Sequence, residues 1–466
     1  MGVAPPPLAR VAVASPPRPG LAWGLQAFIW LLPFHVLLIA VLFSGFGLPT
    51  IAVRAIAAWK ETTVALLVAL TLLNTVAGRT ARTPVQATDL TVGALGLLAL
   101  TYLIGATAWF AADLPTGLQL LGWRDAVFFT LLYFVGRATP QVAQDSRYLG
   151  ALFGVGVITS ALAILERIFV TPQMLVLLGA GRYIQEFLGL APATRNNEYG
   201  LPDNYWTVIG DHVVRRTGSA YLSSQGFAVP FLLLLPAATL WLLSSERRRT
   251  PLAWAGYAVL WTGLLLSVTR MTTVVCVLQV LLLAVAWRRW GPAVGAGLVG
   301  LIGLGVALLL VPDLATFVWE TLTWRTGSSV AHLEDWSEGI QSLMAHPLGV
   351  GLGAGGLTAA RFGLPPTAAD SQYFKYSVEL GVPGLLLYVG ILVALGAAGL
   401  RAFLRAPADP QRCAGALLLV AAIGIALNGL TTAPLTSPPV SYVFFWIGGA
   451  VATVAGRSSN AAAGVR

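Results

Sequence analysis

Long apolar stretches recur along almost the whole chain, and they constrain its fold more than any other feature. A helix needs roughly 20 apolar residues to cross the ~30 Å hydrocarbon core of a bilayer. We therefore predict an all-α polytopic membrane protein with about 12 transmembrane helices. The spans are expected near 22–46, 62–78, 88–110, 119–136, 148–170, 221–243, 251–269, 271–287, 291–311, 372–398, 413–430 and 440–455.

The composition excludes several classes of protein. Only 10% of the 466 residues are charged and 57% are hydrophobic, whereas a soluble domain carries about 25% charged residues. One core could not hide this much apolar surface from water. Soluble enzymes, nucleic-acid binders and disordered scaffolds are therefore excluded. Cys276 and Cys413 both lie in apolar runs, which also excludes a disulfide framework.

The arginines predict the orientation, because cytoplasmic loops of membrane proteins carry an excess of Lys and Arg. Alternate loops and both termini hold 16 of the 28 cations and four of the 19 acids, a net charge of +12. The opposite side then carries −3, and the two together give the chain's +9. We expect both termini in the cytoplasm and two long external loops, at about 171–220 and 312–371.

The chain is predicted to have one membrane domain with short ends. A disordered, proline-rich cytoplasmic leader covers 1–20, a single polytopic domain covers 21–456, and a cytoplasmic tail covers 457–466. The apolar stretch after the leader is too long for a signal-peptide core, so we expect an uncleaved anchor. The cytoplasmic loop between spans six and seven is only SSERRRT. This length argues against a transporter built from two linked parallel halves.

External arginines are candidate anion ligands. Arg215 and Arg216 precede Thr-Gly-Ser at the start of the sixth span, and helix N-termini beside arginines attract anions. Anchoring of the span at the membrane interface is the alternative. Arg270 stands in a tight outer turn, where it needs water, a partner or a ligand because an unpaired charge is costly in the membrane. Snorkelling to the headgroups would also explain it.

The second external loop contains a predicted amphipathic helix. Ser328 or Ser329 can cap it, and its apolar stripe comprises Leu333, Trp336, Ile340 and Leu343. Its wetter faces are expected to hold His332, Glu334, Asp335 and Glu338, and Arg325 precedes it. The helix ends at His346-Pro347. The glycine-rich run that follows lacks a Lys-Ser/Thr pair, so a nucleotide site is rejected, and no metal-ligand spacing occurs.

The start of the tenth span gathers several polar residues. Asp370 and Ser371 are suited to cap the helix, although a catalytic role for Asp370 is equally consistent with its position. Tyr373 and Lys375 follow in the first turn. Glu379 lies deeper in the apolar span, where carboxylates usually face a cavity or a partner.

Three motifs carry a resemblance to a known family: RRTGSAYLSSQ, VTRMTTVV, and the long run DWSEGIQSLMAHPLGVGLGAGG…DSQYFKYSVELGVPGLLLYVGIL. Together they resemble the O-antigen ligase/polymerase superfamily of bacterial envelope glycosyltransferases, over roughly residues 210–400. The resemblance implies metal-independent, inverting transfer of a glycan from undecaprenyl diphosphate to a sugar hydroxyl, on the external face of the bacterial inner membrane. Ligases usually carry His-Asn where this chain has Asp370-Ser371, which favours a polymerase over a ligase.

The same resemblance suggests a role for each candidate residue. Asp370 would be the catalytic base, assisted by Arg270, with His346 and His332 in reserve. The donor diphosphate would be bound by Arg215, Arg216, Arg270 and Arg325. The glycans would be bound by Trp336, Glu338, Tyr373, Lys375 and Glu379.

Expected partners are a lipid-linked glycan donor, a glycan acceptor, membrane lipids and a chain-length regulator protein. No nucleic acid, cofactor or metal is expected. A transporter of lipid-linked sugars is the alternative from another class. It would need charges at the bilayer midplane, whereas apart from Glu166, Arg167 and Glu379 the charges are expected outside the membrane. A scaffold is a third alternative.

Overall fold

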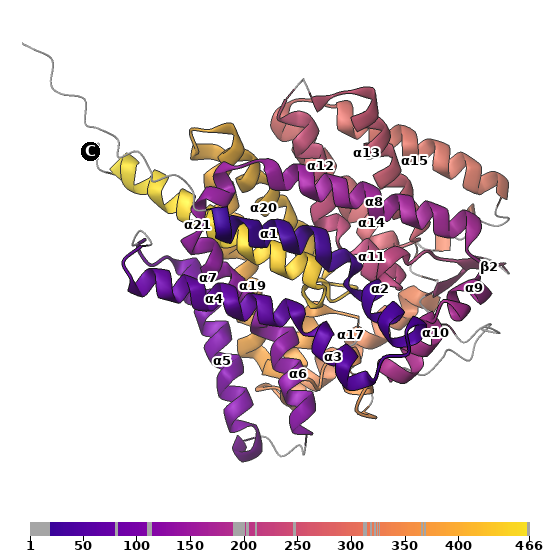
Figure 1. Ribbon diagram of the computed structural model, residues 1–466, viewed down its shortest axis with the longest axis horizontal. Helices are drawn as coiled ribbons and strands as arrows, with labels where there is room; N and C mark the ends of the chain where they lie inside the picture. The colour runs from indigo at the N-terminus through magenta and orange to yellow at the C-terminus, as the bar shows by residue number, and fades with distance from the viewer. Residues whose placement is uncertain are drawn as a thin grey trace, which may run out of the picture.

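The chain folds into a bundle of apolar helices (Figure 1). The computed structural model describes residues 19–79, 83–109, 114–189, 201, 205–209, 212–245, 248–310, 315–316, 319–320, 323, 325, 327–364, 367 and 370–463. Most of the predicted leader and the last three residues of the predicted tail lie outside this part. The fold is all-α and polytopic, as the sequence predicts.

Ten helical segments in the described part are long and apolar enough to cross a membrane. They are Leu21–Gly45, Thr50–Val76, Ala87–Gly105, Thr116–Ala138, Arg147–Phe169, Ser224–Leu243, Arg270–Trp287, Gln372–Arg405, Asp409–Asn428 and Pro438–Arg457. Two further apolar helices, Pro251–Leu266 and Gly291–Val306, fall at predicted spans seven and nine but are shorter. The predicted number of twelve spans is therefore not confirmed.

The helices follow the predicted order along the chain. The first half contains α1 (Pro19–Leu31), α2 (His35–Ala40), α3 (Thr50–Ala57), α4 (Trp59–Val76), α5 (Ala87–Trp109), α6 (Thr116–Val127), α7 (Leu131–Ala138), α8 (Arg147–Phe169), α9 (Pro172–Leu177) and α10 (Ala180–Arg182). The second half contains α11 (Ser224–Ala228), α12 (Phe231–Leu243), α13 (Pro251–Leu266), α14 (Arg270–Trp287), α15 (Gly291–Leu310), α17 (Gly327–Ala345), α18 (Leu357–Ala360), α19 (Gln372–Arg405), α20 (Asp409–Asn428) and α21 (Pro438–Ala463). A short antiparallel hairpin, β1 (Trp206–Ile209) and β2 (His212–Arg215), interrupts the helices.

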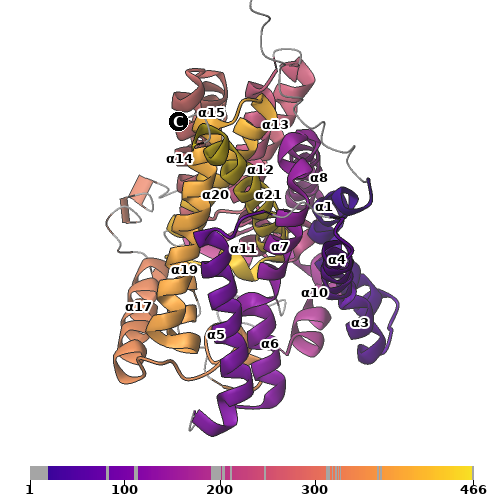
Figure 2. The same cartoon turned by 90° about the vertical axis from the view of Figure 1, so that its left-hand side faces the viewer.

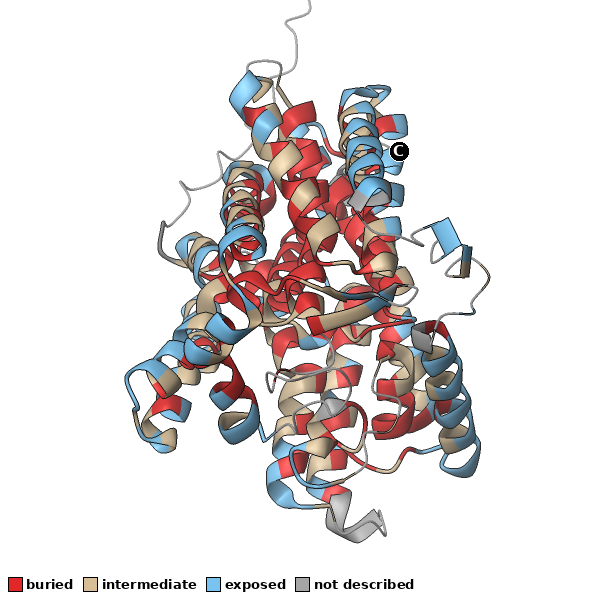
Figure 3. Ribbon diagram, turned by 90° about the vertical axis from the view of Figure 1, so that its right-hand side faces the viewer, coloured by how far each residue is buried: buried red, intermediate tan, exposed pale blue. Residues whose placement is uncertain are grey.

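Helices α12 and α21 form the centre of the bundle. In each of their spans 89% of the apolar window is buried, compared with 17% for Thr50–Val76. Figure 3 shows the same contrast between a buried interior and exposed outer helices. Leu72, Leu73 and Val76 of α4 are 60%, 66% and 88% exposed. Leucine and valine can cover an outer surface in this way when lipid replaces water as the solvent.

Helix α19 is broken at Gly381, and the glycine-rich run that precedes the helix packs against this break. Gly381 has φ 66° and ψ −159°, a conformation that favours glycine. A Cβ atom there would lie 2.3 Å from the Pro347 carbonyl oxygen. The Val382 N–H donates to that carbonyl at 2.8 Å, and the Val350 N–H donates to the Val378 carbonyl at 2.8 Å. The glycine-rich run therefore provides hydrogen-bond partners for backbone groups of α19 that lose their intrahelical partners at the break.

Helix α17 packs against α19 (Figure 2), and the exposure of its residues differs in part from the prediction. Leu333 and Ile340 of the predicted apolar stripe are 47% and 50% exposed, whereas His332 and Asp335 are half-buried. The packed face is set by Gly339, at which a Cβ atom would lie only 2.5 Å from the Phe374 ring. Glu334 and Glu338 are exposed, as expected, whereas His332 and Asp335 are less exposed than predicted, because the close approach at Gly339 brings their side of the helix toward α19.

Candidate active site

A cavity of about 420 Å³ opens between the ends of several helices. This volume lies within the usual range of small-molecule sites, about 300–1,000 Å³. Its lining includes Asp370, Lys375, Arg124, Asp125 and Arg361, together with hydroxyl and amide side chains from 223–225 and 432–437. These segments come from α6, α11, α18, α19 and the α20–α21 connection. The cavity is therefore built from regions distant in the sequence.

Asp370 lies at the edge of this cavity and does not cap α19. Ser371 is the N-cap, and its hydroxyl accepts a hydrogen bond from the Phe374 N–H. The backbone N–H of Asp370 donates to Asp335 Oδ2 at 3.2 Å. Burial raises the pKa of the Asp370 carboxyl; His332 opposes this change and Asp335 adds to it. A carboxylate with a raised pKa is suited to accept a proton near neutral pH.

Lys375 carries a positive charge to the same cavity. Its Nζ forms an ion pair with Glu379, one turn further along α19, and donates to the Gly355 carbonyl at 3.4 Å. The two side chains are 4% and 0% exposed. The predicted intramembrane carboxylate therefore has a partner on its own helix, and that partner lines the cavity.

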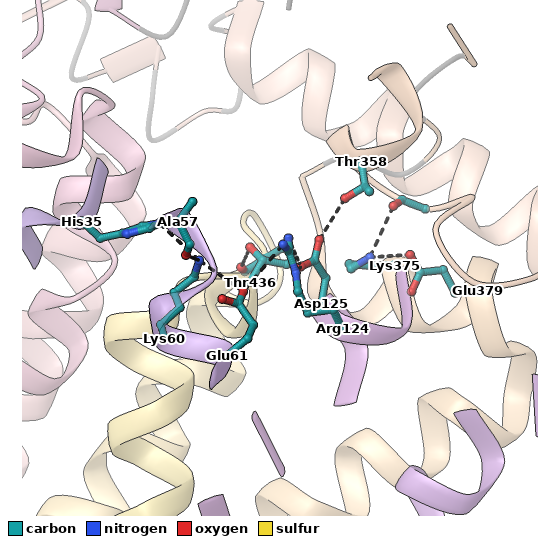
Figure 4. A network of polar contacts seen from close by, with 12 residues as sticks. His35, Ala57, Lys60, Glu61, Arg124, Asp125, Thr358, Lys375, Glu379 and Thr436 are labelled. Atoms are coloured by element: carbon teal, nitrogen blue, oxygen red, sulfur yellow. Dashed lines mark hydrogen bonds and ion pairs between the residues drawn. The ribbon is translucent and has the colours of Figure 1, made fainter. Parts of the chain in front are cut away.

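A network of charges from two earlier spans flanks the cavity (Figure 4). Lys60 Nζ lies 3.2 Å from Glu61 Oε1, and Arg124 Nη1 lies 3.7 Å from the same oxygen. Arg124 also donates two hydrogen bonds to Asp125 Oδ1, at 2.9 and 2.8 Å. Asp125 Oδ2 accepts a hydrogen bond from Thr358 at 3.2 Å. The network therefore links α4, α6 and α18.

Sequence reasoning missed this network. Lys60-Glu61 and Arg124-Asp125 are adjacent opposite charges inside the helical segments Thr50–Val76 and Thr116–Ala138. The sequence predicts only Glu166, Arg167 and Glu379 as charges within the membrane, whereas these four residues lie in helical segments long and apolar enough to cross it. Two neighbouring charges of opposite sign within an apolar span were the signal that could have identified them.

Arg216 and Arg270 lie close enough for the charge of one to act on the other. Arg216 donates from Nε to the Ser267 carbonyl at 3.0 Å and from Nη2 to Thr269 Oγ1 at 2.9 Å. Burial lowers the pKa of Arg216 to about 10, and the nearby positive charge of Arg270 contributes. Within the described part of the chain, both acceptors of Arg216 are neutral groups, which leaves its charge available to an anion. Neither arginine is among the residues that line the 420 Å³ cavity.

A hydrogen-bond chain connects α14, which begins at Arg270, with that cavity. Thr272 Oγ1 accepts from Asn428 Nδ2 at 2.9 Å. Asn428 Oδ1 in turn accepts from Thr432, which lines the cavity. Two hydrogen bonds therefore link the first turn of α14 with the cavity wall.

Arg215 has a different environment from its neighbour Arg216. Its guanidinium donates to the Val170 carbonyl and, at 2.8 Å, to the Glu166 carbonyl, so it holds β2 to the end of α8. The Glu166 carboxylate accepts from the backbone N–H of Ser219 at 2.6 Å and of Gly218 at 3.4 Å. The backbone donors predicted to bind an external anion are thus occupied by a carboxylate of the protein.

The remaining predicted residues lie outside the two described groups. Arg325, Glu338 and His346 are exposed, and none lines the cavity. Trp336 Nε1 donates to the Leu430 carbonyl at 2.8 Å, and Tyr373 donates to the Ala426 carbonyl at 2.9 Å. These two aromatic residues join α17 and α19 to the end of α20. Within the described part of the chain, no group of three His, Cys, Asp or Glu side chains could hold a metal ion.

The family comparison covers the segment that contributes much of this site. Residues 255–389 match the O-antigen ligase family model. The match supports the O-antigen ligase/polymerase superfamily and confirms the resemblance predicted from the motifs. It includes Arg270, Asp370 and Lys375 but not the network of α4 and α6. The family is glycosyltransferase-like. No curated protein matches the chain.

Proposed function

We propose that the chain is a metal-independent, inverting glycosyltransferase of the bacterial inner membrane. It polymerises oligosaccharide repeats carried on undecaprenyl diphosphate into O-antigen, capsule or exopolysaccharide at the external face. The observation that carries the proposal is the cavity in which Asp370 lies among Arg124, Arg361 and Lys375. A buried general base can accept the proton of an attacking sugar hydroxyl, and the cations around it suit anionic, diphosphate-linked substrates.

The reaction assigned to this cavity is a single displacement. The hydroxyl oxygen of the acceptor sugar attacks C1 of the donor sugar, and the C1–oxygen bond to the diphosphate breaks. Asp370 accepts the hydroxyl proton, and undecaprenyl diphosphate leaves with its bonding electrons. Arg216 and Arg270 lie next to this cavity, to which Thr272, Asn428 and Thr432 connect the start of α14. They bind the departing diphosphate, because guanidinium groups donate paired hydrogen bonds to phosphate oxygens.

The experiment uses the purified full chain in liposomes with synthetic lipid-linked repeats, and the products are separated by gel electrophoresis. Wild type gives a ladder of chains on the carrier. Asp370→Asn and Arg270→Ala, if folded, reduce ladder formation by about 10²-fold or more, the usual effect of losing a base or a charge-stabilising donor. Arg147→Gln is the control, because the Arg147 side chain is 87% exposed and does not line the cavity. Full polymer formation by Arg270→Ala would refute the diphosphate role.

Ligation is the second candidate, because the matching family model is described as O-antigen ligase. A ligase would move whole preformed chains from the carrier to a lipid A–core or protein acceptor. The same assay with preformed chains and lipid A–core distinguishes the two activities. Transfer without a ladder supports ligation. Movement of intact lipid-linked glycan across the bilayer, with no new bond, would instead support a transporter.

A further inference from the structure

A second and larger cavity, of about 630 Å³, lies beside the first. It is lined by the outer part of α3 and α4, by Arg124 of α6, by residues 186–189 and by Arg361 and Phe362 after α18. Arg124, Leu188 and Arg361 line both cavities. The two spaces therefore adjoin along a shared cationic wall.

The second cavity has an excess of positive charge. Four cations line it, and only two acids, Glu61 and Glu186, accompany them. Glu61 is paired with Lys60 and Arg124, and Glu186 forms an ion pair at 3.0 Å with Arg182. Both acids therefore already have a cationic partner.

The other two cations of this cavity are Arg54 and Arg361. Among the described residues, neither has an ion-pair partner. Both side chains are exposed to the cavity opening. A concave site with two unpaired guanidinium groups is suited to a phosphate or diphosphate group.

This inference rests on the proposed polymerase activity, which brings together two lipid-linked substrates. The donor loses its diphosphate in the reaction, whereas the acceptor repeat keeps its own diphosphate at the membrane surface. Arg216 and Arg270, proposed for the donor, lie on segments that do not line the second cavity. We propose that the second cavity, through Arg54, Arg124 and Arg361, binds the undecaprenyl diphosphate of the acceptor. The acceptor glycan then extends from the second cavity, past the residues that line both cavities, toward Asp370 in the first cavity.

The test counts bound carrier on the full chain in nanodiscs by native mass spectrometry, with undecaprenyl diphosphate as the probe. Wild type binds two molecules, and Arg54→Gln/Arg361→Gln binds one. Affinity at the altered site falls at least about tenfold, since each hydrogen bond to a charged group contributes about 1.5–3 kcal/mol. Arg147→Gln/Arg401→Gln removes two exposed arginines elsewhere and retains both molecules. Arg361→Lys, which keeps the charge, retains partial affinity.

Two results would overturn the second site. One is two carrier molecules, bound as in wild type, on a folded Arg54→Gln/Arg361→Gln variant. The other is displacement of the second carrier by equimolar phosphatidylglycerol or lipid A, which would identify a site for other lipid phosphates. Failure of the proposed function gives a distinct pattern. Wild type would then bind two carriers and the variant one, but no ladder would form from lipid-linked repeats. This result would support the carrier site and refute the polymerase activity.

Discussion

The buried pair of Lys375 and Glu379 allows the arrangement of the site to be tested through stability. Their side chains are 4% and 0% exposed, so both charges are almost completely buried. Removing one member of a buried ion pair costs about 3–5 kcal/mol, because the remaining charge has no compensation. Glu379→Gln keeps the side-chain volume and removes only the charge. We therefore expect it to destabilise the folded chain by about this amount.

The expected change in melting temperature follows from chain length. An unfolding entropy of about 2.1 cal/mol/K per residue gives about 1 kcal/mol/K for 466 residues. The loss of 3–5 kcal/mol then lowers Tm by about 3–5 °C. Thermal unfolding of the purified chain in detergent, followed by the fluorescence of its 15 tryptophans, measures this shift.

The matched control replaces both charges. Lys375→Met/Glu379→Leu removes the pair together, and such replacements are often neutral or stabilising, so Tm should stay within about 1–2 °C of wild type. The double variant should nevertheless lose polymer formation, because Lys375 lines the cavity. A Tm change below about 1 °C for Glu379→Gln would refute the reasoning, and so would a double variant as unstable as the single one.

Three other predictions concern residues around the site. Burial and Asp335 raise the pKa of Asp370, so activity that needs the carboxylate should fall as pH drops through that raised pKa. Asp335→Asn should move this acidic limb of the pH–rate profile to lower pH; an unchanged limb would contradict the assignment of Asp370 as base. Gly381→Ala should lower the yield of folded protein in detergent chromatography, since a Cβ atom would lie 2.3 Å from a loop carbonyl; wild-type yield and Tm would count against the tight packing. Glu166→Ala leaves the Ser219 N–H without its acceptor and should cost about 1–3 kcal/mol, read as a lower Tm; Glu166→Gln, which keeps an acceptor, should cost less.

Some of the site could be predicted from short sequence patterns. Asp370, Lys375 and Glu379 lie within ten residues, and their position at the start of an apolar helix indicated a functional helix end. The proximity of Arg216 and Arg270 followed from a resemblance to a family, since no local pattern brings residues on two different helices together. The structure places these two arginines close together.

Other parts of the site depend on contacts that sequence patterns do not contain. Arg215 and Arg216 are neighbours in the chain, yet one holds the end of α8 and the other lies beside Arg270. Likewise, Asp370 and Ser371 both resemble N-caps, and only the geometry of α19 assigns the cap to Ser371. Adjacent side chains on a bent backbone point in different directions, so their partners are set by whichever element packs there.

The sequence by itself determined the class of this protein: an all-α chain of membrane-spanning helices, with motifs that resemble the O-antigen ligase/polymerase superfamily. Apolar length and short motifs are local properties, so they can be read along the chain without knowing which helices touch. Only the tertiary structure decided that Lys60, Glu61 and Arg124 lie beside the cavity of Asp370, and that His332 and Asp335 of α17 are half-buried. Those contacts join residues on different helices that are distant along the chain, and helix packing alone selects them.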